Sequence, residues 1–375
     1  MVYLDNAATT KVCPEAAQAA YDIMTAEFGN PSSTHGPGRE ARKKLMDARA
    51  TVAASMGAKP EEIYFTSGGS EGDNWAIRGA CHLRRHRGKH IISSLTEHDA
   101  VRKTLDYMES QGYEVTRLSP HADGAIHPED VEAALRPDTV LVSLMLVNNE
   151  TGAVTDIPAV AKAVKKAGSP ALLHVDAIQG YMKLPFTVKS LGADIVTVSG
   201  HKIHAPKGIG AQYVCQGLQL PALILGGGQE NARRSGTENM PGIAAFAAAV
   251  EAARKDKDAP ARMAALRQRI LDALSPAVPD LTVIGGGAPH ILCLSLPGYK
   301  SEVLLNFLDA MGICVSKGSA CKRGARSHVL EAMGLPARVI DGAIRVSLGR
   351  FTSAEDADAF CAGLIQARDK LFKTL

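Results

Sequence analysis

The chain has 375 residues, and its 42 Lys plus Arg against 39 Asp plus Glu give a formal net charge of only +3. Charges of both signs are mixed along the sequence, whereas nucleic-acid binders concentrate a basic excess and peripheral membrane proteins carry a basic amphipathic block. No run approaches the roughly 18 apolar residues of a membrane span, and the first residues do not resemble a secretory signal. We therefore expect a cytoplasmic protein that binds neither nucleic acid directly nor membranes.

The sequence contains seven cysteines, an odd number, and none of them forms a C-x-x-C pair. This pattern favours reduced thiols over a disulfide framework or a zinc site. We expect no metal site, and any cysteine chemistry should belong to single thiols.

Between about Glu61 and Val214, short β-branched runs alternate with amphipathic stretches, which is typical of a parallel α/β sheet flanked by helices. We expect strands at residues 63–66, 90–93, 140–147, 171–175 and 194–198, and helices at residues 73–86, 100–110 and 158–167. An Ala-rich helix at 240–255 should connect to a second helix at 260–274.

The rest of the chain alternates again, which predicts a smaller α/β unit. We expect strands at residues 291–296 and 343–348, and helices at residues 302–311 and 354–372. Chains longer than roughly 250 to 300 residues usually divide into two domains, so a second hydrophobic core is expected.

Ligands of open α/β sheets gather at the carboxyl ends of the parallel strands, so polar residues in the loops after the predicted strands are candidates for a binding site. The first is a Gly-rich turn at residues 66–71, which includes Gly69 and Ser70 and leads into a helix. Its backbone N–H groups and hydroxyls could bind a phosphate. The alternative is a tight connection without a ligand.

The next loops carry a histidine, an amide and an acid. His98 begins a helix, where it could stack on a flat cofactor or relay a proton, or simply cap the helix. Asn149 lies in a polar loop that could equally be an Asx turn. Asp176 ends an apolar strand, three residues before Gln179, and could pair with a protonated ring nitrogen or cap a helix.

Lys202 follows the strand at 194–198, within a dense polar loop at residues 199–210 that also holds Ser199 and His201. A lysine at a strand end fits an imine-forming amine, whose pKa should be lowered by desolvation and by neighbouring cations such as His201. The alternative is that Lys202 and Lys207 are surface charges. Pyridoxal phosphate has a phosphate, a flat ring, a ring nitrogen and an aldehyde. The sequence offers a matching group for each at one edge of the sheet: the Gly-rich turn, a histidine, an acid and an amine. A nicotinamide cofactor would not require an amine such as that of Lys202.

Ten blocks of this sequence, in order, resemble the cysteine desulfurases of the NifS and IscS type, within the class V aminotransferase group of fold-type I pyridoxal-phosphate enzymes. The blocks are residues 3–10 (YLDNAATT), 29–35, 66–74, 97–98, 147–150, 174–179, 199–210, 234–239 (RSGTEN), 318–321 (GSAC) and 344–351. The resemblance implies a large pyridoxal-phosphate-binding domain at residues 16–255, with a mainly parallel sheet. A smaller α/β domain would comprise residues 1–15 and 256–375 and carry a catalytic cysteine loop.

By this resemblance, Lys202 would hold the cofactor covalently, Asp176 would keep its ring nitrogen protonated, and His98 would stack on the ring and assist proton transfer. Gln179 would contact the ring hydroxyl. The phosphate would be bound by Gly69, Ser70, Ser199 and His201.

The resemblance also implies a homodimer, because Thr237 matches a threonine that reaches the phosphate of the partner subunit. Arg345 would form a bidentate pair with the substrate carboxylate, with Asn149 nearby. Ser70 stands where the family usually has threonine, a change that keeps the hydroxyl.

Cys321 lies in a loop of small residues, where Lys317, Lys322 and Arg323 could lower its thiol pKa, whereas the alternative is an inert loop cysteine. The resemblance makes it the nucleophile that takes sulfur from L-cysteine, leaving L-alanine and a persulfide. An acceptor, such as an iron-sulfur scaffold or a tRNA thiolation enzyme, would receive the sulfur. Rival activities are selenocysteine lyase, class V transaminase, and a non-catalytic sulfur carrier or scaffold-binding protein.

Overall fold

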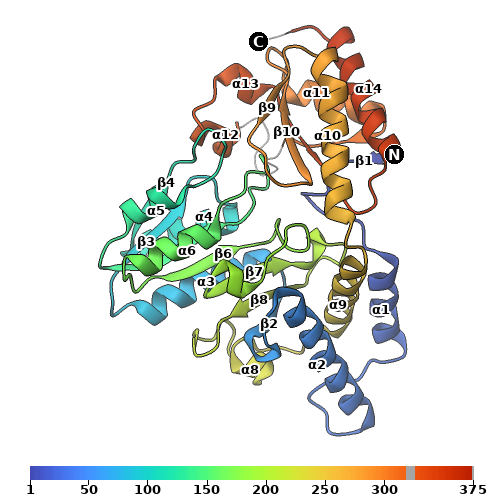
Figure 1. Cartoon of the computed structure of the whole chain (residues 1–375). Helices are drawn as coiled ribbons and strands as arrows, with labels where there is room; N and C mark the ends of the chain where they lie inside the picture. The colour runs from blue at the N-terminus through green and yellow to red at the C-terminus, as the bar shows by residue number, and fades with distance from the viewer. Residues whose placement is uncertain (318–325, 374–375) are drawn as a thin grey trace.

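The structure is a computed structural model and describes residues 1–317 and 326–373. Its larger unit is built on a seven-stranded sheet with the strand order β2-β8-β7-β6-β5-β3-β4 (Figure 1). Strand β8 runs antiparallel to both of its neighbours, and the other pairs are parallel. The strands are β2 (Ile63–Thr66), β3 (His90–Ser94), β4 (Glu114–Leu118), β5 (Thr139–Met145), β6 (Leu172–Asp176), β7 (Ile195–Ser199) and β8 (Gly210–Val214). The predicted mainly parallel sheet is confirmed.

Helices cover both faces of this sheet, so its central strands are buried on both sides and appear in the sequence as continuous apolar runs. One core packs α1, α2 and α9 against the sheet, and the other packs α3 and α4 against the opposite face. The helices of this unit are α1 (Pro14–Thr25), α2 (Gly36–Met56), α3 (Gly69–Arg84), α4 (Asp99–Ser110), α5 (Pro128–Ala134), α6 (Ile157–Lys166), α7 (Val188–Leu191) and α9 (Met240–Lys255), with 3-10 turns η1 (Pro60–Glu62) and η2 (Gly200–Lys202). The segment labelled α8 (Gln229–Ala232) is a left-handed turn rather than an α-helix.

The smaller unit lies above the large sheet in Figure 1 and has its own core. Its antiparallel sheet has the order β12-β10-β9, and β1 pairs with β11 in a parallel ribbon beside it. The strands are β1 (Val2–Tyr3), β9 (Thr282–Ile284), β10 (Ile291–Ser295), β11 (Ile313–Cys314) and β12 (Ala343–Ser347). The helices are α10 (Ala259–Ala277), α11 (Ser301–Ala310), α12 (His328–Ala332), α13 (Ala337–Asp341) and α14 (Ala354–Lys370).

The two ends of the chain meet in this smaller unit. Leu4 belongs to the same buried cluster as residues of β10, β12 and α14. The chain passes from the lower to the upper unit between α9 and α10 (Figure 1). The domain boundaries expected after residues 15 and 255 stay predictions.

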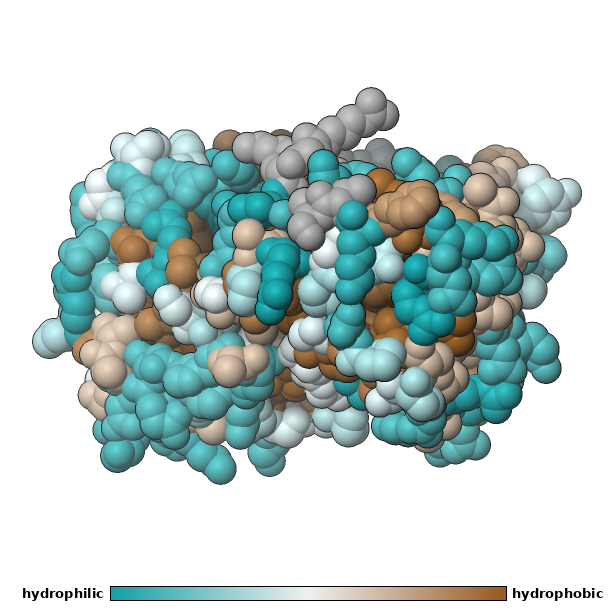
Figure 2. Space-filling view, turned by 90° about the horizontal axis from the view of Figure 1, so that it is seen from above, coloured by the Kyte–Doolittle hydropathy of each residue, from teal (hydrophilic) through white to brown (hydrophobic). Residues whose placement is uncertain are grey.

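The surface seen from above is mostly hydrophilic, with hydrophobic residues scattered between (Figure 2). Within the described ranges, no helix is long and apolar enough to cross a membrane. The six cysteines inside those ranges are unpaired, and Cys321 lies outside the described residues.

Candidate active site

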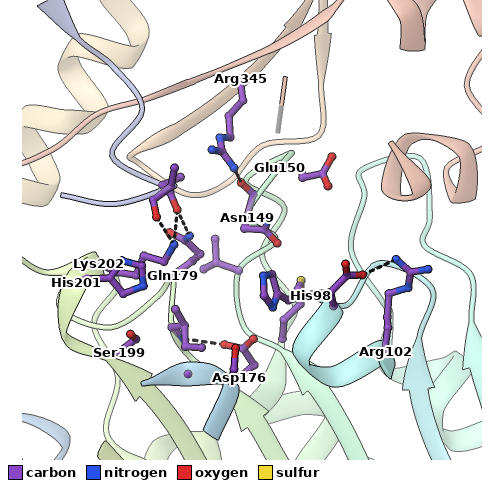
Figure 3. A pocket seen from close by; sticks show the side chains of 18 of the residues that line it. His98, Arg102, Asn149, Glu150, Asp176, Gln179, Ser199, His201, Lys202 and Arg345 are labelled. Atoms are coloured by element: carbon purple, nitrogen blue, oxygen red, sulfur yellow. Dashed lines mark hydrogen bonds and ion pairs between the residues drawn. The ribbon is translucent and has the colours of Figure 1, made fainter. Parts of the chain in front are cut away.

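A cavity of about 510 Å³ opens at the carboxyl ends of β5, β6 and β7, and β12 of the smaller unit closes it from the other side (Figure 3). Ten of the residues singled out from the sequence line it: Gly69, Ser70, His98, Asn149, Asp176, Gln179, Ser199, His201, Lys202 and Arg345. Thr237 is exposed and does not line this cavity, and Cys321 falls outside the described residues. Loops far apart in the sequence therefore converge because the parallel strands all end at this edge.

Lys202 ends the short η2 turn after β7, and its Nζ donates hydrogen bonds to Ala7 O at 2.7 Å and Ala8 O at 2.8 Å (Figure 3). Burial, and next the positive charge of Arg345, lower the pKa of the Lys202 amine to about 8. The expectation that His201 supplies the neighbouring cation is wrong. Burial lowers the pKa of His201 to about 4, so its ring is neutral at pH 7.

Asp176 is the last residue of β6 and is buried at the floor of the cavity, where its carboxylate accepts a hydrogen bond from Ile178 N at 2.9 Å. Burial raises the pKa of this carboxyl, whereas that hydrogen bond and the charges of His98 and Lys202 favour the ionised form. A cationic ring nitrogen bound beside Asp176 would favour the carboxylate further.

Two more acids lie buried near Asp176. Burial raises the pKa of Glu97 to about 8, although it accepts hydrogen bonds from Ser94 Oγ at 2.7 Å and Met145 N at 3.1 Å. Burial also holds the pKa of Asp73 well above its ordinary value. Burial therefore disfavours the charged form of both acids, and of these three acids Asp176 is the one that lines the cavity.

The Gly-rich turn brings the start of α3 close to the neighbouring loop. A Cβ added to Gly69 would lie only 2.1 Å from Ile178 Cδ1, so a side chain there would displace Ile178. Gly68 has a φ of +148°, a conformation that L residues rarely adopt. The backbone N–H groups at the start of this 16-residue helix therefore border the cavity, as an anion site requires.

Two buried polar atoms of cavity residues have no hydrogen-bond partner among the described residues. These are Ser199 Oγ and Gln179 Oε1, although Gln179 Nε2 donates to Ala7 O at 2.9 Å. Buried polar atoms are nearly always hydrogen-bonded, so their orphaned state in a cavity points to a polar ligand.

His98 caps α4, because its Nδ1 accepts a hydrogen bond from Ala100 N at 3.1 Å. The capping alternative therefore holds, yet the ring also lies toward the middle of the cavity in Figure 3. His98 therefore caps α4 through Nδ1, and its ring is still accessible to a ligand in the cavity.

Arg345 reaches the cavity from β12 and is 4% exposed. One terminal nitrogen donates to Asn149 O at 2.7 Å, and the other pairs with Asp5 Oδ1 at 2.8 Å. The contact with Asp5 was not foreseen from the sequence, where Asp5 appeared only as part of a matched block.

The segment from Asp5 to Thr10 ties the two units together at the cavity. Ala7 N donates to Ser347 Oγ at 2.9 Å on β12, and Thr10 Oγ1 donates to His201 O at 2.9 Å on the large unit. The carbonyls that hold Lys202 belong to this same segment.

The outer wall includes groups that sequence patterns did not single out. Glu150 is buried and accepts a 2.5 Å hydrogen bond from Ser327 Oγ, the N-cap of α12. Arg326 also lines the cavity and forms an ion pair with Asp341. Lys317, one of the cations expected near Cys321, forms an ion pair with Glu302.

The family model for aminotransferase class V matches residues 2–360. The chain is also 44% identical to a cysteine desulfurase from Trichormus azollae over 364 residues, covering 96% of this chain and 90% of that protein. This chain belongs to the cysteine desulfurase family of class V aminotransferases. Among solved structures, a NifS-like protein superimposes with a TM-score of 0.93 at 36% identity, covering 99% of this chain and 100% of the other. Another, SspA in complex with cysteine, gives a TM-score of 0.83 at 31% identity, covering 94% of this chain and all of SspA.

The class V aminotransferases and cysteine desulfurases use pyridoxal phosphate as their cofactor, and the cavity fits it. The lining offers a partly deprotonated amine, a buried carboxylate and the start of a helix. It also contains Ser199 Oγ and Gln179 Oε1, the two orphaned polar atoms. These groups match an aldehyde, a ring nitrogen, a phosphate and a ring hydroxyl.

Proposed function

We propose that this cysteine desulfurase removes sulfur from L-cysteine, producing L-alanine and a persulfide on Cys321 that passes to an acceptor. The observation that carries the proposal is the pairing of two groups in one cavity: the Lys202 amine, whose pKa is about 8, and the buried Arg345 guanidinium. A neutral amine suits a carbonyl cofactor, and a planar guanidinium suits the carboxylate of an amino acid.

The cofactor would be held from three sides. Lys202 would bond to its aldehyde carbon, Asp176 would pair with the ring nitrogen, and His98 would stack on the ring. Gln179 would contact the ring hydroxyl, and the phosphate would be bound at the start of α3 by Gly69, Ser70, Ser199 and His201. His201 would act there as a neutral donor, since burial lowers its pKa to about 4.

When bound, pyridoxal phosphate supplies an electron sink that makes the α-proton of an amino acid acidic. Arg345 and Asn149 would fix the substrate carboxylate, which orients the α-carbon toward the inner end of the cavity. Lys202 would accept the α-proton as a neutral amine, and His98 would move a proton on the opposite side of the cavity.

The sulfur step would use the Cys321 thiolate as nucleophile toward the sulfur of the substrate. An S–S bond forms as the C–S bond of the substrate breaks, and the carbon gains a proton in place of sulfur. The products balance as L-alanine and a Cys321 persulfide.

The proposal also includes a homodimer and a sulfur acceptor. Thr237 is exposed and does not line the cavity of its own chain, which is compatible with a role at the site of a second subunit in a homodimer. The acceptor would be an iron-sulfur scaffold or a tRNA thiolation enzyme. The cytoplasmic location expected from the sequence stays a prediction.

The test compares alanine and sulfide release from L-cysteine by the wild type, Cys321→Ala and Cys215→Ala. Cys215 is a matched control, because it is a half-buried free thiol whose pKa is raised to about 11 by burial. We expect Cys321→Ala to lose desulfuration and Cys215→Ala to keep it. Normal release of alanine and sulfide by Cys321→Ala would contradict the proposal and favour a lyase that needs no cysteine nucleophile.

A further inference from the structure

Asp5 interacts with two groups that the proposed chemistry uses, Arg345 and Lys202. Its Oδ1 is 2.8 Å from a terminal nitrogen of Arg345, and its negative charge also raises the pKa of Lys202. The Asp5 side chain is 22% exposed and that of Arg345 is 4% exposed, so solvent screens this pair only in part.

The chain holds Asp5 in this place through its neighbours. Asn6 Nδ2 donates to Ser347 O at 2.9 Å, Ala7 N donates to Ser347 Oγ at 2.9 Å, and Asp5 itself bridges to Ser347. Because Ser347 is two residues from Arg345 on β12, the acid and the guanidinium are fixed on adjacent backbone segments. The backbone therefore positions the ion pair between Asp5 and Arg345, unlike a pair formed by flexible surface side chains.

The Asp5 carboxylate, which already pairs with Arg345, should weaken the binding of a second carboxylate to the same guanidinium. An amino acid that places its carboxylate on this guanidinium comes within a few ångströms of the Asp5 carboxylate, and like charges at such a distance repel in a poorly hydrated cavity. The substrate L-cysteine and the product L-alanine carry the same carboxylate, so the repulsion weakens both complexes alike. Because the repulsion weakens the binding of L-cysteine and L-alanine alike, it lowers the affinity for the substrate and also increases the rate at which the product dissociates.

We propose that Asp5 competes with the amino-acid carboxylate for Arg345 and thereby promotes release of the alanine product. Asp5 acts through Arg345 and is a positioning residue rather than a catalytic one. This inference rests on the proposed function, because it assumes that Arg345 receives the amino-acid carboxylate.

The experiment measures binding of L-alanine to the holoenzyme without turnover, by calorimetry, for the wild type and Asp5→Asn. Asparagine keeps the shape and an acceptor for Arg345 but removes the charge. We expect L-alanine to bind about tenfold more tightly to Asp5→Asn. Ethylamine, which lacks the carboxylate, should bind equally to both proteins.

Three controls keep the inference falsifiable. Asp5→Glu retains the charge and should bind L-alanine as weakly as the wild type, and Asp5→Ala provides a second neutral variant should Asp5→Asn fold poorly. Asp256→Asn removes another acid that pairs with arginine, outside the cavity, and should leave the affinity unchanged. In steady state, Asp5→Asn should lower KM and kcat for L-cysteine together.

A second readout follows the amine. In the holoenzyme the Lys202 nitrogen is bonded to the cofactor, and the negative charge of Asp5 should favour the protonated form of that nitrogen. Asp5→Asn should therefore move the pH midpoint of the visible absorption of the bound cofactor downward, which a purely structural role for Asp5 would not do. Unchanged or weaker L-alanine binding by Asp5→Asn would overturn the inference. Failure of the wild type to release sulfur from L-cysteine would instead refute the proposed function, since the binding assay needs no sulfur transfer.

Discussion

Replacing Arg345 with glutamine should raise the pKa of the Lys202 amine. The ordinary value of 10.5 falls to about 8 in the folded chain, which corresponds to about 3 kcal/mol in favour of the neutral amine. Burial causes most of this change and Arg345 is the next cause. A cation at cavity distance is worth roughly 1 to 2 kcal/mol at an effective dielectric constant near 20, so its loss should move the pKa upward by about one pH unit.

The assay is the rate at which protein stripped of cofactor takes up pyridoxal phosphate as a function of pH. Only the neutral amine attacks the aldehyde, so the wild-type rate should rise with pH and level off above a midpoint near 8. The midpoint of Arg345→Gln should lie about one pH unit higher. Arg102→Gln is the matched control, because Arg102 also lines the cavity but pairs with Asp99. A wild-type midpoint near 10.5, or equal midpoints in the wild type and Arg345→Gln, would refute the reasoning.

Two further predictions concern stability and catalysis. Arg49→Met should destabilise the fold by about 3 to 5 kcal/mol in urea titrations, because it leaves the carboxylate of Glu230 buried without the guanidinium that bonds both of its oxygens. The double variant Arg49→Met/Glu230→Gln should recover part of the loss, and a change below about 1 kcal/mol in the single variant would contradict the prediction. Asp176→Ala should keep the visible absorption of bound cofactor but lower kcat for L-cysteine by roughly a hundredfold, because the ring nitrogen loses its acid. Unaltered turnover would show that this acid is not needed.

The elements found from the sequence are those with strong local patterns. The strand at Ile63–Thr66 and the helix at Met240–Lys255 match their predicted bounds, because one is a continuous buried run and the other an Ala-rich stretch with clear ends. Helix α2 was missed because half of its buried residues are glycine or alanine and another is an arginine, which leaves few large apolar residues in its sequence. Its apolar periodicity is therefore weak, although it packs closely on α9.

The site was predictable in its residues but not in its contacts. Asp176 and Lys202 each follow a parallel strand, and parallel strands end at the same edge of a sheet, so the proximity of these two residues could be predicted. The ion pair between Asp5 and Arg345 joins residues 340 positions apart, so no local sequence pattern predicts it. The neutral state of His201 depends on its burial by residues distant in the chain, which is why a cation was expected there.

In the proposed reaction, sulfur leaves L-cysteine as a persulfide on Cys321, and this persulfide can be detected by mass spectrometry. The holoenzyme is incubated with L-cysteine without an acceptor, alanine is quantified, and the peptide containing Cys321 is examined by mass spectrometry without reduction. We expect one alanine for each protein chain in the first turnover and a mass increase of one sulfur atom on that peptide. Alanine formed without added sulfur on the Cys321 peptide would contradict it.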